Sequence, residues 1–483
     1  FIFNQFVTED DKLFISESNI VAWATQPIKA RNILFLDEAN LSPRSWLMFE
    51  GLFHPEPSLF IEGKHYPLSP QHKVIFAGNP THYGSGRSLA PFFEQHDFEV
   101  IFDPMPLCAV YEQTLKPIFT EAFKSLEGFD LIIEHLLHIY AVICNLSTTD
   151  VLITPRQLQM MALLIENHHR HNPKDELIQI AQHYAYQIAH PLIPNSHKND
   201  FAKRFEVTRP SPPPLPILSS EDGNTFLITA SRRPIAEYLS DVLNLREHRQ
   251  KYRGNGPQSF GGLGGIILEG APGIGKSELV IAMLHAHGYR EAFYPKTPMS
   301  DRYFYYLSAS LSQQDKEDLL LKAFHDGAVV IADEINSSRM LESLLNHLLM
   351  GKTPAGEPPK RPGFTLIGTQ NPTTMSGRFA QSSAFSNRLM TFILPEYDIH
   401  ELVELLKHHH VHDDKCQALT QAFLNARQFA EAHHLEPKPT LRELLKIAKQ
   451  YTKPIESNQT EDDTPPRKKE NTEATSSVHS TTT

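Results

Sequence analysis

Cysteine is scarce in this sequence of 483 residues. The three cysteines, Cys108, Cys144 and Cys416, are scattered without paired spacing. A disulfide framework and a cysteine-rich zinc site are therefore not expected, and a reducing compartment is favoured. We interpret the three side chains as buried thiols.

Basic charge and long apolar runs are lacking as well. A formal net charge of -11 offers no overall basic surface for nucleic acid, although a local basic patch stays open. The most apolar helical stretch, residues 131–146, contains Glu134, His135 and His138 and is shorter than the ~20 residues that a bilayer requires. The sequence thus predicts no membrane span and a cytoplasmic protein, while a targeting segment before Phe1 stays open.

Histidine, by contrast, is abundant, with 26 in all. Two clusters stand out, one at His168, His169 and His171 and the other at His408, His409, His410 and His412. Consecutive histidines on a helix point to different faces, and no cysteine or carboxylate joins them at ligand spacing. We interpret both clusters as solvated helix faces, with metal binding as the alternative.

Proline is concentrated in one run, residues 209–216, with the sequence RPSPPPLP. Such a run fits neither a helix nor a central strand, so we expect extended polyproline II chain. We interpret residues 193–222 as an interdomain linker, and a ligand for an SH3-type domain is the alternative. Residues 453–483 are rich in Thr, Ser, Glu and Lys and predict a disordered tail.

A pair of apolar strands with polar ends recurs on either side of the linker. The polar ends correspond in order, and they are Asp37, Glu38 and Asn79 in the first half and Asp333, Glu334 and Asn371 in the second. The separations between aspartate and asparagine, 42 and 38 residues, nearly agree. The order of elements therefore indicates an internal repeat.

Short continuous apolar runs of this kind are typical of buried parallel strands with helices on both faces. Each pair is followed by a block with apolar residues at helical spacing. The sequence therefore predicts an α/β fold with two tandem modules, each a parallel sheet followed by a helical lid. The expected boundaries are residues 1–106 and 107–192 for the two parts of module 1, 193–222 for the linker, 223–397 and 398–452 for the two parts of module 2, and 453–483 for the tail.

The most specific motif lies in the second half, after an apolar run at residues 265–269. It is a complete G-x-x-x-x-G-K-[ST] phosphate loop, made of Gly270, Ala271, Pro272, Gly273, Ile274, Gly275, Lys276 and Ser277. Glycines let backbone amides turn inward around phosphates, the lysine meets the β and γ charges, and the hydroxyl coordinates Mg²⁺. An apolar helical pattern follows, so we predict nucleotide binding here.

Four polar residues further along predict a hydrolysis site. Asp333 lies 57 residues after Lys276 and is expected to hold Mg²⁺ through water, while Glu334 orients or deprotonates the attacking water. Asn371, at the end of a predicted strand, is a candidate for positioning that water. Arg388, expected to be exposed just before another apolar strand, is a candidate arginine finger.

Together with Thr440-Leu441-Arg442, these motifs resemble the AAA+ ATPases, in particular the group of dynein, midasin and the MoxR-like proteins. Residues 224–245, before the phosphate loop, are similar to that group. So is the stretch of residues 351–363, which carries an inserted hairpin in relatives. The resemblance covers both halves, roughly residues 1–192 and 220–452.

The resemblance implies ATP and Mg²⁺ as cofactors of module 2, with Lys276 and Ser277 binding phosphate and Mg²⁺. The other implied roles are Walker B for Asp333 and Glu334, sensor 1 for Asn371 and sensor 2 for Arg442. Arg388 would act in trans, on the nucleotide of a neighbouring module.

The first half departs from this pattern in two places. A lysine matching Lys276 would lie about 20 residues before Phe1, so we expect a truncated module 1 without a phosphate loop. His96 stands at the place of the arginine finger, which puts finger function in doubt. Arg156 keeps the sensor 2 place. Residues 60–66 predict a hairpin around Glu-Gly, either the family's insert or a surface hairpin without a partner.

The expected function is ATP hydrolysis coupled to movement between AAA+ modules, used to remodel or dismantle a protein complex in a ring-like assembly. The expected partners are neighbouring modules, in the same chain or an oligomer, and an unidentified protein client. A nucleotide-regulated scaffold with slow turnover is the main alternative. A metabolic kinase or a nucleic-acid motor is disfavoured by the tandem copy and the acidic charge, and GTP in place of ATP stays open.

Overall fold

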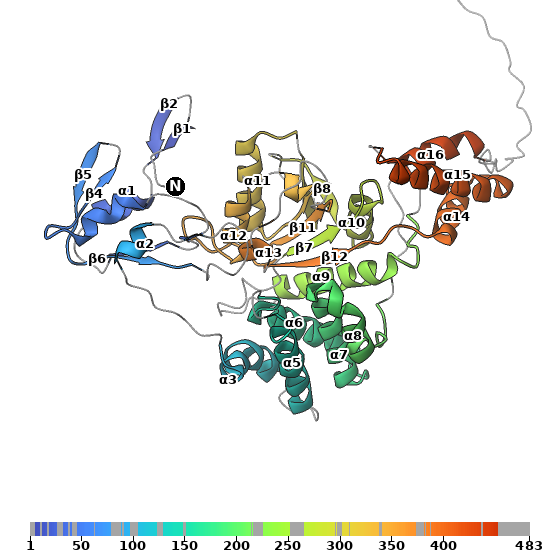
Figure 1. The fold of residues 1–483 in the computed structure, drawn as a ribbon, viewed down its shortest axis with the longest axis horizontal. Helices are drawn as coiled ribbons and strands as arrows, with labels where there is room; N and C mark the ends of the chain where they lie inside the picture. The colour runs from blue at the N-terminus through green and yellow to red at the C-terminus, as the bar shows by residue number, and fades with distance from the viewer. Residues whose placement is uncertain are drawn as a thin grey trace, which may run out of the picture. The chain divides into compact units, whose positions relative to one another are not determined.

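The computed structural model describes residues 5–9, 12–16, 19–26, 32–36, 39–40, 46–61, 63–78, 88, 91–96, 105–122, 129–147, 151–213, 215, 226–251, 265–294, 296, 302–308, 310–337, 341–372, 381, 383–386, 388–435 and 438–452. The chain divides into two compact units, Phe1–Glu401 and Leu402–Thr483. Figure 1 shows the elements of both.

A six-stranded parallel sheet forms the α/β core of the first unit (Figure 1). In their order across the sheet the strands are β12 (Leu389–Ile393), β7 (Gly265–Glu269), β11 (Thr365–Gln370), β10 (Val329–Ala332), β9 (Tyr303–Leu307) and β8 (Arg290–Ala292). Because all neighbouring pairs are parallel, the carboxyl ends of the strands lie along one edge. The sequence motifs of the second half follow those ends.

Helices cover both faces of this sheet, as the continuous apolar runs of the second half predicted. They are α9 (Arg233–Lys251), α10 (Lys276–Ala286), α11 (Gln313–Asp326), η5 (Ile335–Ser337), α12 (Glu342–Leu349) and α13 (Ser383–Ser386). Alternate side chains of β10 enter two cores. Val329 and Ile331 pack with α9 and α10, and Val330 and Ala332 pack with α11 and α12.

A separate α/β region precedes this core in the sequence. Its elements are β1 (Gln5–Glu9), β2 (Lys12–Ser16), α1 (Asn19–Thr25), β3 (Asn32–Leu36), η1 (Leu47–Phe53), β4 (Ser58–Ile61), β5 (Lys64–Pro67), β6 (His72–Phe76) and α2 (Pro91–His96). Aromatic rings dominate its core, where Phe76 packs edge-on against Trp46 and Phe49. The antiparallel pair β4 and β5 confirms the predicted hairpin.

The two strand pairs that suggested a repeat have the same register. β3 and β6 are parallel, with Leu36 paired to Phe76, and β10 and β11 are parallel, with Ala332 paired to Gly368. In both pairs the first residue lies one position before the aspartate of the motif, and the second lies three positions before the asparagine. The described strands of both pairs therefore have the same register relative to the motif positions in the sequence.

The faces of the two sheets differ, which corrects the expectation of helices on both faces in the first half. One face of β3 and β6 exposes apolar side chains, with exposed fractions of 55% for Ile33, 59% for Phe35 and 47% for Ile75. The positions in the same register on β10 and β11 are buried against α9 and α10. The sequence alone could not distinguish these cases because both runs are continuously apolar.

A helical block follows the first α/β region. It contains α3 (Leu107–Val110), η2 (Tyr111–Leu115), α4 (Lys116–Ala122), α5 (Phe129–Cys144), α6 (Pro155–His171), α7 (Leu177–Ala189), η3 (His190–Leu192) and α8 (Asn195–Phe205). α8 corrects the expectation of a linker over residues 193–222. Its Phe201 and Phe205, four residues apart, bury one helix face, and Phe201 stacks on Tyr186.

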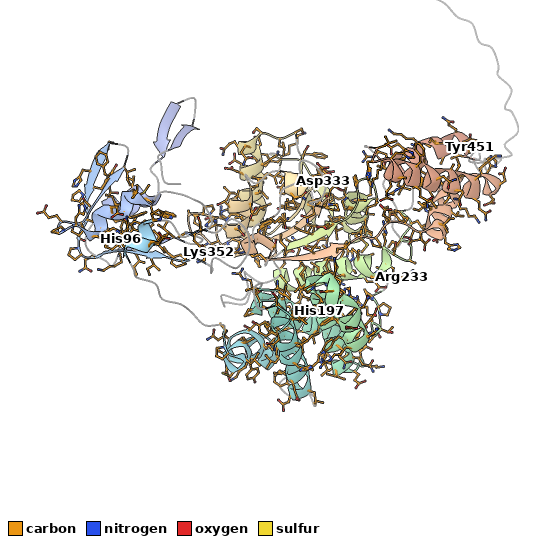
Figure 2. All side chains as sticks on the ribbon, viewed as in Figure 1. His96, His197, Arg233, Asp333, Lys352 and Tyr451 are labelled. Atoms are coloured by element: carbon orange, nitrogen blue, oxygen red, sulfur yellow. The ribbon has the colours of Figure 1, made fainter. Side chains whose placement is uncertain are left out.

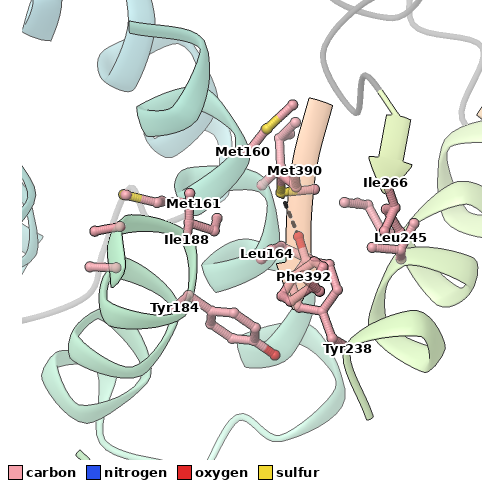
Figure 3. Close-up of a cluster of buried hydrophobic side chains, with 14 of the residues drawn as sticks. Met160, Met161, Leu164, Tyr184, Ile188, Tyr238, Leu245, Ile266, Met390 and Phe392 are labelled. Carbon is pink, nitrogen blue, oxygen red and sulfur yellow. Dashed lines mark hydrogen bonds between the residues drawn. The ribbon is translucent and has the colours of Figure 1, made fainter. Parts of the chain in front are cut away.

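This helical block shares one core with α9 and β12. Figure 3 shows Leu164 of α6 and Tyr184 of α7 beside Tyr238 of α9 and Phe392 of β12. The Tyr238 hydroxyl donates to the Met390 sulfur at 2.6 Å. The block is therefore packed onto the α/β core that follows it in the sequence.

A buried polar network reinforces this contact. Tyr184 donates its hydroxyl to Asp241 of α9 at 2.8 Å, and Arg209 forms an ion pair with the same carboxylate at 2.9 Å. His168 contacts Tyr184 at 3.1 Å through one ring nitrogen and Asp175 at 2.8 Å through the other. His168 is buried, so the interpretation of its cluster as a solvated face is wrong at this residue.

The second unit is helical. Its elements are the larger part of α14 (Ile399–His408), α15 (Asp413–Ala432), α16 (Leu441–Ala448) and η6 (Lys449–Tyr451). Apolar residues at helical spacing, among them Leu402, Leu406 and Leu444, are buried, as their pattern predicted. The tail, residues 453–483, lies outside the described residues.

The structure tests the expected burial of the three cysteines and the prediction that no helix spans a membrane. Cys416 is buried as expected, but Cys108 and Cys144 are exposed, so the interpretation of buried thiols is wrong for both. Cys108 is the second residue of α3, and Cys144 is the last residue of α5. Among the described helices, none combines the length and the apolar character needed to cross a bilayer.

Substitution of Gly327 would test how tightly the loop after α11 is packed. Its φ is +64°, and a Cβ there would lie 2.3 Å from the Pro362 carbonyl oxygen. We expect Gly327→Ala to destabilise the protein by ~2–4 kcal/mol, from the left-handed backbone and the clash together. Gly356→Ala, with φ +85° and open space around the Cβ, should cost only the ~1–2 kcal/mol of the left-handed backbone. Urea unfolding followed by far-UV circular dichroism measures both, and equal losses would contradict the packing argument.

Candidate nucleotide site

The phosphate loop connects the end of β7 to the start of α10. Gly273 and Gly275 have φ values of +72° and +81°, which side chains other than glycine rarely adopt. α10 begins at Lys276, so the amides of its first turn point toward the loop. The local backbone therefore has the geometry that binds a phosphate group.

Lys276 joins the loop to the end of β11. Its side chain is buried, and its ammonium donates to the carbonyl oxygens of Gly270 at 2.8 Å and Ala271 at 2.9 Å. It also donates to the Asn371 side-chain oxygen at 3.0 Å. The structure thus brings together two residues that the sequence predicted for one site although they are 95 positions apart.

Asp333, labelled in Figure 2, accepts hydrogen bonds from three hydroxyl groups. Ser277 donates to one carboxylate oxygen at 3.0 Å and Tyr306 to the other at 2.8 Å, and Thr369 donates as well. Desolvation would raise the pKa of Asp333, but the hydroxyl donors outweigh it and hold the pKa below its ordinary value. The carboxylate is therefore ionised at neutral pH.

Tyr306 and Thr369 were missed by sequence reasoning. Tyr306 is the last residue but one of β9, and Thr369 has the same place on β11, the two strands that flank β10. Both residues lie at the carboxyl ends of strands next to β10. They can be recognised in the sequence only when the order of the strands in the sheet is known. Burial and the Asp333 carboxylate raise the pKa of Tyr306, so its hydroxyl remains a donor.

Glu334 has a strained backbone beside this carboxylate. Its φ is +49°, which is uncommon for a residue with a side chain and recurs at functional sites. Its side chain is exposed and accepts a hydrogen bond from the Asn371 amide at 3.4 Å. Asn371 therefore lies between Lys276 and Glu334, with its oxygen on the lysine and its nitrogen near the glutamate. Asn336 fixes the Asn371 backbone by donating to its carbonyl oxygen at 2.8 Å.

Arg388 is buried, with 8% of its surface exposed, which corrects the expectation of an exposed residue. Its guanidinium donates to the Asn346 side-chain oxygen at 2.8 Å and to the Met350 sulfur at 3.3 Å. Asn346 lies in α12, and Met350 directly follows that helix. Arg388, just before β12, is therefore buried by contacts with residues in and next to α12. The sequence pattern does not reveal these contacts.

His96 has a contact like that of Arg388. Its ring lies 2.8 Å from the Glu50 carboxylate and stacks on Phe53 at 3.7 Å. Glu50 follows the first aspartate of the motif by 13 positions, and Asn346 follows Asp333 by the same interval. Both residues at the predicted finger place thus contact a side chain 13 positions after the corresponding aspartate.

Arg156 and Arg442 occupy equivalent places on their helices. Each is the second residue of its helix, α6 or α16, after a threonine that forms a capping box, and both side chains are exposed. Arg442 belongs to the second unit. The module 1 counterparts Asp37, Glu38 and Asn79 lie outside the described residues.

The residues of module 2 fit a nucleoside triphosphate with Mg²⁺. The cradle offers a buried ammonium on Lys276 and the backbone amides of a helix start, which suit phosphate oxygens. Ser277 and Asp333, 3.0 Å apart, supply a hydroxyl and an ionised carboxylate, the oxygen ligands that Mg²⁺ prefers. The donor set does not choose between ATP and GTP.

Comparisons with known proteins agree with this geometry. Residues 265–389 match the family described as "AAA domain (dynein-related subfamily)". The curated protein "Midasin" of Giardia intestinalis is 34% identical over 143 residues, a match that covers 26% of this chain and 3% of the midasin chain. The chain thus aligns with a small part of that relative. Both findings support an AAA+ ATPase of the dynein and midasin type for the part of the chain that carries the phosphate loop.

Tyr306→Phe tests the hydroxyl that the sequence did not reveal. Loss of a hydroxyl that orients the Asp333 carboxylate should weaken Mg²⁺-dependent nucleotide binding by up to about tenfold. Titration with fluorescent ATP at varied Mg²⁺ measures this effect. Tyr305→Phe is the matched control, because the Tyr305 hydroxyl is buried without a hydrogen-bond partner in the described structure. Equal affinities of the two variants would contradict the assignment.

Proposed function

We propose that the chain binds and hydrolyses ATP at the site formed by residues 270–277, 333–334 and 371. The observation that carries the proposal is the position of Asn371, which contacts the Lys276 ammonium at 3.0 Å and the Glu334 carboxylate at 3.4 Å. A purely structural asparagine before a proline would not need to join a phosphate-loop lysine to an exposed carboxylate.

The geometry supports a defined reaction. Lys276 and the loop amides orient the phosphates, and Mg²⁺ held by Ser277 and Asp333 would supply charge neutralisation. Glu334 takes a proton from the attacking water, whose oxygen bonds to the γ-phosphorus while the bond to the β-phosphate oxygen breaks. Asn371 holds Glu334 in place for that transfer. The products are ADP and inorganic phosphate.

We also propose that residues 1–192 and 220–452 are two AAA+ modules in tandem. Support comes from the identical register of β3–β6 and β10–β11, and from the like anchoring of His96 and Arg388. The matching capping boxes before Arg156 and Arg442 agree. The apolar face of β3 and β6 lacks the phosphate-loop helix that covers its counterpart in module 2.

The proposed use of hydrolysis is remodelling or disassembly of a protein complex, in the manner of a chaperone-like ring of modules. The helical block of module 1 shares a core with α9 and β12 of module 2, so that a movement of one module would be felt by the other. Neighbouring AAA+ modules and a protein client are the proposed partners, with no nucleic acid, and the proposed location is the cytoplasm.

A second function, a nucleotide-regulated scaffold with slow turnover, is favoured by one observation. Arg388 is buried and bonded to Asn346 of its own module, and an arginine finger must leave such a contact to reach a neighbouring nucleotide. The two functions differ in rate and share the same binding site.

ATP turnover separates these functions. Lys276→Ala should abolish nucleotide binding because it removes the cradle's charge, and Glu334→Gln should keep binding while lowering the rate at least ~100-fold. Phosphate release and fluorescent-nucleotide titration measure the two quantities. If the wild type binds ATP but turns it over no faster than Lys276→Ala, the scaffold function replaces the enzyme.

The stoichiometry of binding tests the assignment of the site to module 2. A chain of these 483 residues should bind one nucleotide, as measured by equilibrium dialysis with radiolabelled ATP, because it contains one phosphate loop. Asp37→Asn should leave the stoichiometry and affinity unchanged, whereas the equivalent Asp333→Asn should weaken binding. A second equivalent of nucleotide, lost in Asp37→Asn, would assign a working site to module 1.

A further inference from the structure

The segment between β12 and α14 is fastened at three points to the α/β core. The Pro395 carbonyl oxygen accepts from the Arg232 guanidinium at 2.7 Å. The Tyr397 hydroxyl donates to the Ile274 carbonyl oxygen at 3.2 Å. The Glu401 carboxylate accepts from the Ser231 amide at 2.7 Å.

Arg232 and Tyr397 lie at the centre of this attachment. We call this pair of residues the clamp. The guanidinium carbon lies 3.6 Å from the centre of the Tyr397 ring, in stacking contact. Arg232 is 1% exposed, and its other partners are the neutral oxygens of Ser231 at 2.7 Å and Ile274 at 3.5 Å. Its Nε is buried without a hydrogen-bond partner in the described structure.

Stability alone does not explain this choice of residues. A buried guanidinium that contacts neutral oxygens recovers little of its lost hydration, and an apolar pair of similar volume would pack at lower cost. The pair does provide direction, because a planar guanidinium and a phenol hydroxyl fix the carbonyl groups that they contact. Arg232 and Tyr397 are therefore better suited to positioning the carbonyl groups that they contact than to stabilising the fold.

The clamp region contacts the phosphate loop on one side and adjoins the start of α14 on the other. Ile274 lies inside the phosphate loop, two residues before Lys276, and both members of the clamp donate to its carbonyl oxygen. At the other end, Glu401 lies in the first turn of α14, the helix that continues into the second unit. Glu401 also accepts from the Asp398 amide at 3.1 Å, which closes the helix start.

We propose that Arg232 and Tyr397 are positioning residues that couple the phosphate loop to the start of α14. The proposal rests on nucleotide binding at residues 270–277. Phosphate held by the loop amides fixes the loop backbone, and the Ile274 carbonyl then becomes a fixed acceptor for the clamp. The clamp in turn fixes residues 395–401, so nucleotide binding orders the entry to the helical unit that carries Arg442. By linkage, a loss of this coupling must act in both directions.

Hydrogen exchange measured by mass spectrometry tests the coupling in the full chain. The measurement is made on the Glu334→Gln variant, because this variant should leave the added ATP with MgCl₂ unhydrolysed. ATP should slow amide exchange at least threefold in peptides from residues 270–277 and in peptides from residues 395–408. Adding Tyr397→Phe, which removes the hydroxyl and keeps the ring on Arg232, should preserve the slowing in the loop and abolish most of it in residues 395–408.

A merely structural role gives a different result. It would speed exchange of residues 395–408 equally with and without ATP, and that outcome overturns the proposal. Unchanged protection of residues 395–408 in Tyr397→Phe overturns it too. Tyr305→Phe is the matched control and should retain the full ATP effect. Arg232→Lys, which keeps the charge and loses the planar stack, should show the same loss as Tyr397→Phe.

Turnover supplies an independent measure. With Glu334 present, Tyr397→Phe should lower kcat severalfold while KM for ATP stays within about threefold, because the loop itself is intact. Failure of the proposed function is distinguishable, since it would show as a wild type that binds ATP no better than Lys276→Ala. A wild type that binds and hydrolyses ATP, with residues 395–408 indifferent to Tyr397→Phe, overturns the clamp alone.

Discussion

The carboxylate of Asp333 is the acceptor on which the site depends. Its donors come from β9, β11 and the start of α10, so one side chain joins three elements that are distant in the sequence. The join is possible because parallel strands bring their carboxyl ends to one edge of the sheet. It lowers the pKa of the carboxyl and keeps the negative charge that a metal ion needs. Glu334 follows directly, in a strained backbone that the neighbouring strands must hold.

The sequence predicted the parts of the site that have a fixed spacing or a characteristic order. The phosphate loop is recognisable because its glycines, lysine and hydroxyl occupy one local stretch, and Asn371 because it ends an apolar run. Tyr306 and Thr369 could not be predicted, since their roles arise from strands that are neighbours only in the folded sheet. Arg388 was misjudged for the same reason. Its burial is produced by Asn346 of α12 and by Met350 directly after that helix, which lie some 40 positions earlier.

In the first region, the sequence predicted the pairing of strands but not their surroundings. A run such as that of β3 is apolar at every position, and such a run is compatible with one covered face or two. The structure covers one face with a core of aromatic rings and leaves Ile33, Phe35 and Ile75 on the other. Coverage depends on which helices lie against a sheet, and that information is not contained in the strand. The same limit applies to α8, whose two phenylalanines were hidden inside a range rich in polar residues and proline.

α9 connects the two features that make module 2 part of a larger system. Asp241, near the middle of this helix, is bound by Tyr184 of the preceding helical block and by Arg209 of the proline-rich run. Arg232 of the clamp immediately precedes the helix, and its contact with Ile274 reaches the phosphate loop. A displacement of the helical block at Asp241 would act first on this buried polar network. The network resists such a displacement because breaking it would leave a charged group unpaired in the interior. α9 therefore carries contacts to the helical block at Asp241 and directly follows Arg232, whose contact with Ile274 reaches the loop that would hold the phosphates.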